Sequence, residues 1–198
     1  MQIFRLNIRK KLSKWFEDPL VSLLVSLKIS PSVITSIGLL VAILAGYFCL
    51  LGYFLYAGLL VLFSSLFDLL DGGVARKTGK TSSQGAMLDS VFDRFSEVLV
   101  LLGLSVYFIN NGENLMIILS FVALSGSLMV SYIRARAESL GVSGTSGLFT
   151  RPERVIIVVI CLLINLPNFA VWILAIGTPI SALHRLIASL ISIKRNQK

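Results

Sequence analysis

Four aspartates lie within one short stretch of the chain, residues 68 to 93. Asp68 and Asp71 close one long apolar run, and Asp89 and Asp93 open the next. Residues three or four apart lie on one face of an α-helix, so each pair can present both carboxylates to the same side. Ionised carboxylates at an apolar margin repel one another and need a counter-charge. A divalent cation is the simplest one, so the stretch predicts a site for one or two Mg²⁺ or Mn²⁺ ions.

The residues between the two aspartate pairs suit a phosphate-bearing ligand. Gly72 and Gly85 leave room for a ligand to approach the backbone, and Arg76 can bind a phosphate. The hydroxyl of Ser82 can hydrogen-bond to a nucleotide. Because carboxylate-bound divalent ions commonly bridge phosphate oxygens, we expect a phosphate ester with a good leaving group as the substrate. The alternative is that these glycines only serve helix packing and that the aspartates only cap interfaces.

The composition indicates an integral membrane protein. Of the 198 residues, 56% are hydrophobic and 14% are charged, against about 25% charged in typical soluble proteins. A spanning helix needs about 20 mainly apolar residues. Candidate spans occur at residues 33–51, 54–71, 86–109, 114–135, 153–166 and 168–190. We therefore expect an all-α fold in which residues 1–198 form a single domain and residues 31–198 form a bundle of six transmembrane helices.

The segment before the first candidate span mixes basic with apolar side chains. Residues 1–30 therefore predict an amphipathic juxtamembrane helix in the membrane interface, with a disordered basic tail as the alternative. Ser30 and Pro31 mark a break in the chain, and Ser32 is the expected N-cap of the first span.

The basic residues predict the orientation of the protein in the membrane. Of the 18 Lys and Arg residues, 16 fall at the N-terminus, in or beside the loops expected at 72–85 and 136–152, or at the C-terminal end, while Arg94 and Arg185 lie in the halves of the third and sixth candidate spans on the same side. The positive-inside rule places both termini, both loops and therefore the aspartates in the cytoplasm of a cell-membrane protein. The net charge of +8 then favours anionic lipid and an anionic substrate over nucleic acid.

A second basic cluster is expected on the same side of the membrane as the aspartates. Arg134 and Arg136 end the fourth candidate span, Arg151 and Arg154 open the fifth, and Arg185 lies in the sixth. Together these arginines could form a pocket for the phosphate of an acceptor alcohol. The alternative is that they only set the topology and contact lipid headgroups.

The central stretch resembles the motif of the CDP-alcohol phosphatidyltransferase family, D-x-x-D-G-x-x-A-R-x(8)-G-x-x-x-D-x-x-x-D. The matching positions are Asp68, Asp71, Gly72, Ala75, Arg76, Gly85, Asp89 and Asp93. The resemblance implies an interfacial N-terminal helix, six membrane helices, a cytoplasm-facing polar cavity and a homodimer. It also implies two divalent ions that hold the diphosphate of a CDP-linked lipid, such as CDP-diacylglycerol or CDP-archaeol.

The resemblance further implies a role for individual residues. Asp68, Asp71 and Asp89 would be metal ligands, and Asp93 would be both a ligand and the general base that takes the proton from the attacking hydroxyl. The residues implied to contact the CDP-lipid are Pro31, Ser32, Gly72, Ala75, Arg76, Ser82 and Gly85. Glu97, one turn after Asp93, could lie behind the site or pair with an arginine.

The acceptor alcohol distinguishes the subfamilies. Enzymes that make phosphatidylglycerol phosphate usually read D-P-x-A-D-K at the second aspartate pair, whereas this chain reads DSVFDR over residues 89–94. That string, and residues 131–154, resemble enzymes that use inositol 1-phosphate and their archaeal relatives. We therefore expect synthesis of phosphatidylinositol phosphate or archaetidylinositol phosphate with release of CMP, with glycerol 3-phosphate as the alternative acceptor.

Cation transport is an alternative from a different class of function. Asp89, Asp93 and Glu97 follow one another at spacings of four, as acidic residues along an ion pathway can. However, the aspartates gather at one end of their helices, and no polar face continues to the other side. This pattern favours an enzyme over a transporter.

Overall fold

The computed structural model describes residues 18–142 and 149–196, and within these ranges its regular elements are all helices. They are α2 (Asp18–Ser26), α3 (Pro31–Leu50), α4 (Phe54–Thr78), α5 (Ser83–Asn110), α6 (Asn114–Ser139), α7 (Arg151–Leu163) and α8 (Pro167–Asn196). Residues 1–17, which hold most of the expected juxtamembrane helix, lie outside the described residues.

All six segments expected to span the membrane lie mainly in helices, although the fifth, expected at 153–166, is helical only to Leu163. Four of them, α3, α4, α6 and α8, are long and apolar enough to cross a membrane. The helix α7 has only 13 residues, fewer than the roughly 20 that a span needs, and the first half of α5 is rich in charged residues. The structure therefore supports an all-helical membrane protein, and a count of six spans stays a prediction.

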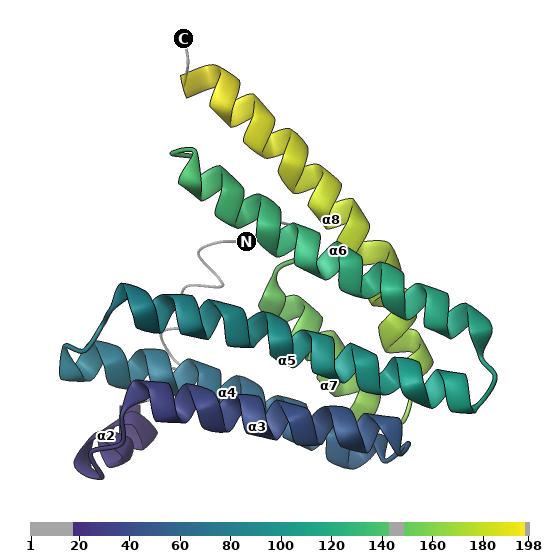
Figure 1. The fold of residues 1–198 in the computed structure, drawn as a ribbon, viewed down its shortest axis with the longest axis horizontal. Helices are drawn as coiled ribbons and strands as arrows, with labels where there is room; N and C mark the ends of the chain where they lie inside the picture. The colour runs from purple at the N-terminus through teal and green to yellow at the C-terminus, as the bar shows by residue number, and fades with distance from the viewer. Residues whose placement is uncertain (1–17, 143–148, 197–198) are drawn as a thin grey trace.

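The helices form two groups that are joined by α7 and by packing of α5 against α6. In the first group, α3 packs against both α4 and α5, and in the second group α6 runs along α8 at an angle to the first (Figure 1). The helix α7 contacts α4 and α8. The short α2 packs against α4, near the end of the bundle where α4 ends and α5 begins (Figure 1). This arrangement leaves the facing ends of α4 and α5 available for polar residues.

The connection between α4 and α5 is shorter than the loop predicted at residues 72–85. The helix α4 continues through two glycines to Thr78 and ends at Gly79, whose φ of 66° lies in the left-handed region. The predicted loop was wrong because glycine weakens a helix by only about 1 kcal/mol, and the basic residues of the last turn favour the helix end. The helix α5 begins after Ser82, whose hydroxyl accepts a hydrogen bond from the Gly85 N–H at 3.0 Å.

The start of α3 also differs from the prediction. Ser30 is the N-cap and Pro31 is the first helical residue, so Ser32 lies inside the helix. Proline is favoured at this position because the N–H that it lacks would have no partner within the helix. The predicted N-cap at Ser32 is therefore wrong by two residues.

Two glycines let α3 and α5 approach each other closely. A Cβ atom on Gly103 would overlap the carbonyl oxygen of Gly46, and one on Gly46 would lie 2.6 Å from the carbonyl oxygen of Leu99. We expect Gly103→Ala to lower the stability by about 1–3 kcal/mol, as overpacking of a core does. Thermal unfolding in detergent measures this loss as a lower apparent Tm. Leu102→Ala, at a neighbour that is 54% exposed, should change Tm much less, and equal losses would contradict the close contact.

Candidate active site

Three of the four aspartates come together at the facing ends of α4 and α5. Asp68 and Asp71 lie on α4 and Asp89 lies on α5. One carboxylate oxygen from each lies within 4.8 Å of the other two. Asp71 is buried, and the other two are partly buried. Carboxylates this close repel one another unless a cation lies among them.

The cluster fits a divalent cation in a further respect. The Oδ1 atom of Asp89 is buried and has no hydrogen-bond partner within residues 18–142 and 149–196. Such an oxygen is destabilising when it is left without a partner. Mg²⁺ and Mn²⁺ bind carboxylate oxygens in preference to softer ligands, so an ion in the cluster would satisfy it. The three carboxylates are therefore placed to hold a divalent ion.

Asp71 is also held from a third helix. The hydroxyl of Thr35, on α3, donates a hydrogen bond to Oδ2 of Asp71 at 2.6 Å. This contact ties the first turns of α3 to the acidic cluster. Thr35 could not be identified from the sequence, because a single threonine in an apolar helix belongs to no pattern.

Asp93 has an arginine as its close partner. Arg151, the first residue of α7, pairs with Asp68 through one terminal nitrogen and with Asp93 through the other, the latter at 2.7 Å. Burial lowers the pKa of Arg151, but the charges of Asp68 and Asp93 outweigh burial, so the pKa is raised overall. The guanidinium stays charged and offsets part of the negative charge of the cluster. Arg151, predicted in a pocket for the acceptor phosphate, is thus brought to the aspartates.

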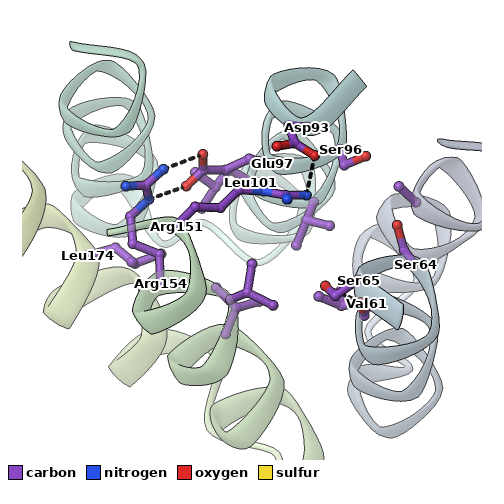
Figure 2. A pocket seen from close by; sticks show the side chains of 14 residues that line it. Val61, Ser64, Ser65, Asp93, Ser96, Glu97, Leu101, Arg151, Arg154 and Leu174 are labelled. Carbon is purple, nitrogen blue, oxygen red and sulfur yellow. Dashed lines mark hydrogen bonds and ion pairs between the residues drawn. The ribbon is translucent and has the colours of Figure 1, made fainter. Parts of the chain in front are cut away.

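Glu97 and Arg154 form a second ion pair one helical turn further along. Arg154 donates from Nε and Nη2 to the two carboxylate oxygens of Glu97, at 2.7 and 3.0 Å, and from Nη1 to the carbonyl oxygen of Phe149 at 3.2 Å. Figure 2 shows Asp93 paired directly with Arg151 and Glu97 paired directly with Arg154, and all four side chains line a small cavity of about 40 Å³. Of the two interpretations of Glu97, the structure supports pairing with an arginine.

A larger cavity of about 360 Å³ adjoins the acidic cluster. It lies between the start of α3, the end of α4 and the start of α5, and both Asp71 and Asp89 contribute to its wall. It is also lined by every residue that the family resemblance assigns to the CDP-lipid, namely Pro31, Ser32, Gly72, Ala75, Arg76, Ser82 and Gly85. Lys80, which was not identified from the sequence, adds a positive charge to this wall.

The remaining predicted arginines lie on α6 and α8. Arg185 is buried, and its Nε has no hydrogen-bond partner in the described part of the chain. It lies close enough to Arg134 and Arg154 for their charges to act on it. Arg134 also pairs with Glu138 of its own helix at 2.8 Å. Arg136 is exposed and lies two positions from Arg134, about 200° around the helix, so it points away from this group.

Comparisons of the sequence place the chain in one family. Residues 28–183 match the CDP-alcohol phosphatidyltransferase family. The chain is 39% identical over 164 residues to the archaetidylinositol phosphate synthase of Pyrococcus horikoshii. The match covers 82% of this chain and 84% of that protein. It is 30% identical over 182 residues to the phosphatidylinositol phosphate synthase of Cutibacterium acnes, with 89% and 87% covered.

Comparison of the fold agrees with the sequence match. The crystal structure of the phosphatidylinositol phosphate synthase of Mycobacterium tuberculosis with CDP-DAG bound is similar over 89% of this chain and 94% of that chain, with a TM-score of 0.82 and 30% identity. The structure of the same enzyme in complex with manganese and citrate gives a TM-score of 0.81. The likeness therefore extends far beyond the aspartate motif. The chain is a membrane-bound transferase that belongs to the CDP-alcohol phosphatidyltransferase family.

Proposed function

We propose that the enzyme transfers a phosphatidyl or archaetidyl group from a CDP-linked lipid to a hydroxyl of a phosphorylated polyol, and that the polyol is inositol 1-phosphate. The observation that carries this proposal is the position of the acidic cluster. It adjoins the 360 Å³ cavity on one side, and through Arg151 it is linked to the helix that bears Arg154. The names of the relatives from Pyrococcus, Cutibacterium and Mycobacterium support inositol phosphate as the acceptor.

The reaction forms one bond and breaks another. The acceptor hydroxyl oxygen would bond to the phosphorus next to the lipid, while that phosphorus loses its bond to the oxygen bridging to CMP. CMP leaves with the bridging oxygen, and the hydroxyl proton passes to Asp93. We assign the proton to Asp93 rather than to Glu97, because both oxygens of Glu97 already accept hydrogen bonds from Arg154.

The carboxylates and the cavity would bind the donor lipid. Asp68, Asp71 and Asp89 would hold a divalent ion, Mg²⁺ or Mn²⁺, and Asp93 would contribute to a site for two ions. When bound, these ions supply positive charge next to the oxygens of the diphosphate. Arg76 would add a further positive charge from the wall of the cavity.

The phosphate of the acceptor would bind where Arg134, Arg154 and Arg185 gather. The buried Nε of Arg185 is a donor that a phosphate oxygen could satisfy, and guanidinium groups bind phosphate through parallel hydrogen bonds. We leave Arg136 out of this pocket because it lies about 200° around α6 from Arg134. Arg151 would lie at the junction between this pocket and the aspartates.

The proposal includes the placement of the enzyme in the membrane. The distribution of basic residues supports six spans with both termini and the active site in the cytoplasm. The family resemblance supports a homodimer. Neither feature is needed for the chemistry assigned to the aspartates.

A panel of acceptors tests the proposed function. Purified enzyme with Mg²⁺ and either CDP-diacylglycerol or CDP-archaeol should release CMP with inositol 1-phosphate at least about tenfold faster than with glycerol 3-phosphate, free inositol or serine. A difference of this size corresponds to about 1.4 kcal/mol in the transition state. Faster release with glycerol 3-phosphate would overturn the choice of acceptor, and release with serine would overturn the phosphate pocket. A reaction without acceptor measures background hydrolysis.

A further inference from the structure

Glu97 is an acidic residue in the site that the motif does not include. It follows Asp93 by one helical turn, and its side chain is 16% exposed, while that of Arg154 is 2% exposed. A buried guanidinium is stabilised only when carboxylates or other acceptors satisfy its donors. Here the carboxylate binds Nε and Nη2 together. Because a guanidinium is planar and rigid, a contact through two atoms sets both its position and its orientation.

The hydrogen bonds of Arg154 leave part of its guanidinium for a ligand. An arginine has five N–H donors. Glu97 accepts two of them and the carbonyl oxygen of Phe149 accepts one. Two donors remain among the contacts of the described residues, one on each terminal nitrogen. Two donors on adjacent nitrogens match two oxygens of one phosphate.

The charges around Arg154 also require Glu97. Arg134 and Arg154 each lie close enough to Arg185 for their charges to act on it, and the like charges of the buried Arg154 and Arg185 repel. Glu97 offsets the charge of Arg154 through its bonds to Nε and Nη2. Without this carboxylate, the positive charge of Arg154 would lose the partner that offsets it beside Arg185.

We propose that Glu97 is a positioning residue, which orients Arg154 for the phosphate of the acceptor and takes no part in the proton transfer at Asp93. This inference rests on the proposed function, because it requires an acceptor that carries a phosphate. Its consequence is a separation along α5, where Asp93 serves the reaction and Glu97, one turn later, serves recognition of the acceptor.

The test is a double-mutant cycle with Glu97→Gln and Arg154→Gln. Glutamine keeps the size of the side chain but removes the charge. Each single variant should raise KM for inositol 1-phosphate by about tenfold or more, in line with the loss of a charge-assisted hydrogen bond. KM for CDP-diacylglycerol should not change. Because Glu97 acts through Arg154, the double variant should resemble Arg154→Gln alone, whereas independent effects would multiply.

Two further variants separate positioning from a general structural role. Glu97→Asp keeps the charge on a shorter side chain and should give a smaller rise in KM for inositol 1-phosphate. If Glu97→Gln does not fold, Glu97→Asp replaces it in the test. Glu113→Gln is the matched control, because Glu113 is the N-cap residue of α6, beyond the far end of α5, and accepts a hydrogen bond from Asn168 at 2.7 Å. It should leave KM for inositol 1-phosphate unchanged.

The outcomes distinguish this inference from the proposed function. Equal rises in KM for both substrates, or multiplied effects in the double variant, would overturn the positioning role. An unchanged KM in Glu97→Gln, with a wild type that uses inositol 1-phosphate, would overturn it too and leave the function intact. If the wild type releases no CMP with any phosphorylated polyol, the proposed function itself fails.

Discussion

Asp93→Asn should lower kcat for CMP release by about 100-fold or more, since a positioned general base contributes about 10²- to 10⁴-fold. Asparagine has nearly the same size as aspartate but cannot take the proton of the acceptor hydroxyl. It can still accept a hydrogen bond from Arg151, which Asp93 contacts at 2.7 Å, so the local packing should survive. The measurement is CMP release at saturating CDP-diacylglycerol and inositol 1-phosphate.

A matched carboxylate outside the site controls for the loss of one charge. Asp18 lies at the start of α2 and is exposed, so Asp18→Asn should keep kcat within about twofold, as surface substitutions away from a site usually do. Size-exclusion profiles and apparent Tm values should show that both variants fold. If Asp93→Asn keeps more than a tenth of the wild-type kcat, Asp93 is not the base. A loss that appears only in KM would instead give Asp93 the role proposed for Glu97.

The helices could be predicted from the sequence better than their ends could. Long apolar runs predict the segments α3 to α8, because a chain in lipid must keep its backbone hydrogen bonds internal. The end of α4 was missed because Arg76 and Lys77, although they extend the helix to Thr78, contribute nothing to an apolar pattern. The end of α6 at Ser139 lies four residues beyond the predicted span for the same reason.

The aspartates and the larger cavity could be predicted from the sequence more easily than the ion pairs made by the arginines of α7. The aspartates and the wall of the larger cavity come from neighbouring helices and a short connection, so one local motif includes most of them. The ion pairs of α7 were not predictable, because Arg151 reaches Asp68 over 83 positions and Arg154 reaches Glu97 over 57 positions. Only the packing of α7 against its neighbours decides which carboxylate each arginine meets. Arg134 and Glu138 are the exception, since a spacing of four predicts their pairing.

The negative charges of the carboxylate cluster are not equally offset by the protein itself. Arg151 offsets the charge of Asp68 and Asp93 through direct pairing. No such partner reaches Oδ1 of Asp89 within the described ranges. A divalent ion would therefore act most directly on Asp89, which makes this residue the most informative one to change.

Asp89→Asn should lower the affinity for Mn²⁺ by about 100-fold or more, because even residues that only support a metal ligand are worth about 10- to 100-fold. Electron paramagnetic resonance of free Mn²⁺, titrated with purified protein, measures binding without any turnover. CMP release should fall together with Mn²⁺ binding. Glu138→Gln, which removes an exposed carboxylate paired with Arg134, should bind Mn²⁺ as the wild type does. An unchanged affinity in Asp89→Asn would exclude Asp89 as a ligand.

The thermal stability of Asp89→Asn should respond to Mn²⁺ in a way that a general loss of structure would not produce. An ion that binds only the folded state stabilises it, by about 2.7 kcal/mol at 100 times Kd, so the apparent Tm of the wild type should rise with Mn²⁺. In Asp89→Asn this rise should be absent. Without metal, however, the variant should be at least as stable as the wild type, because one of three mutually repelling carboxylates is gone. If the variant is less stable than the wild type without metal, Asp89 supports the fold. A role in metal binding alone predicts instead that the variant is at least as stable as the wild type without Mn²⁺ and less stable than it with Mn²⁺.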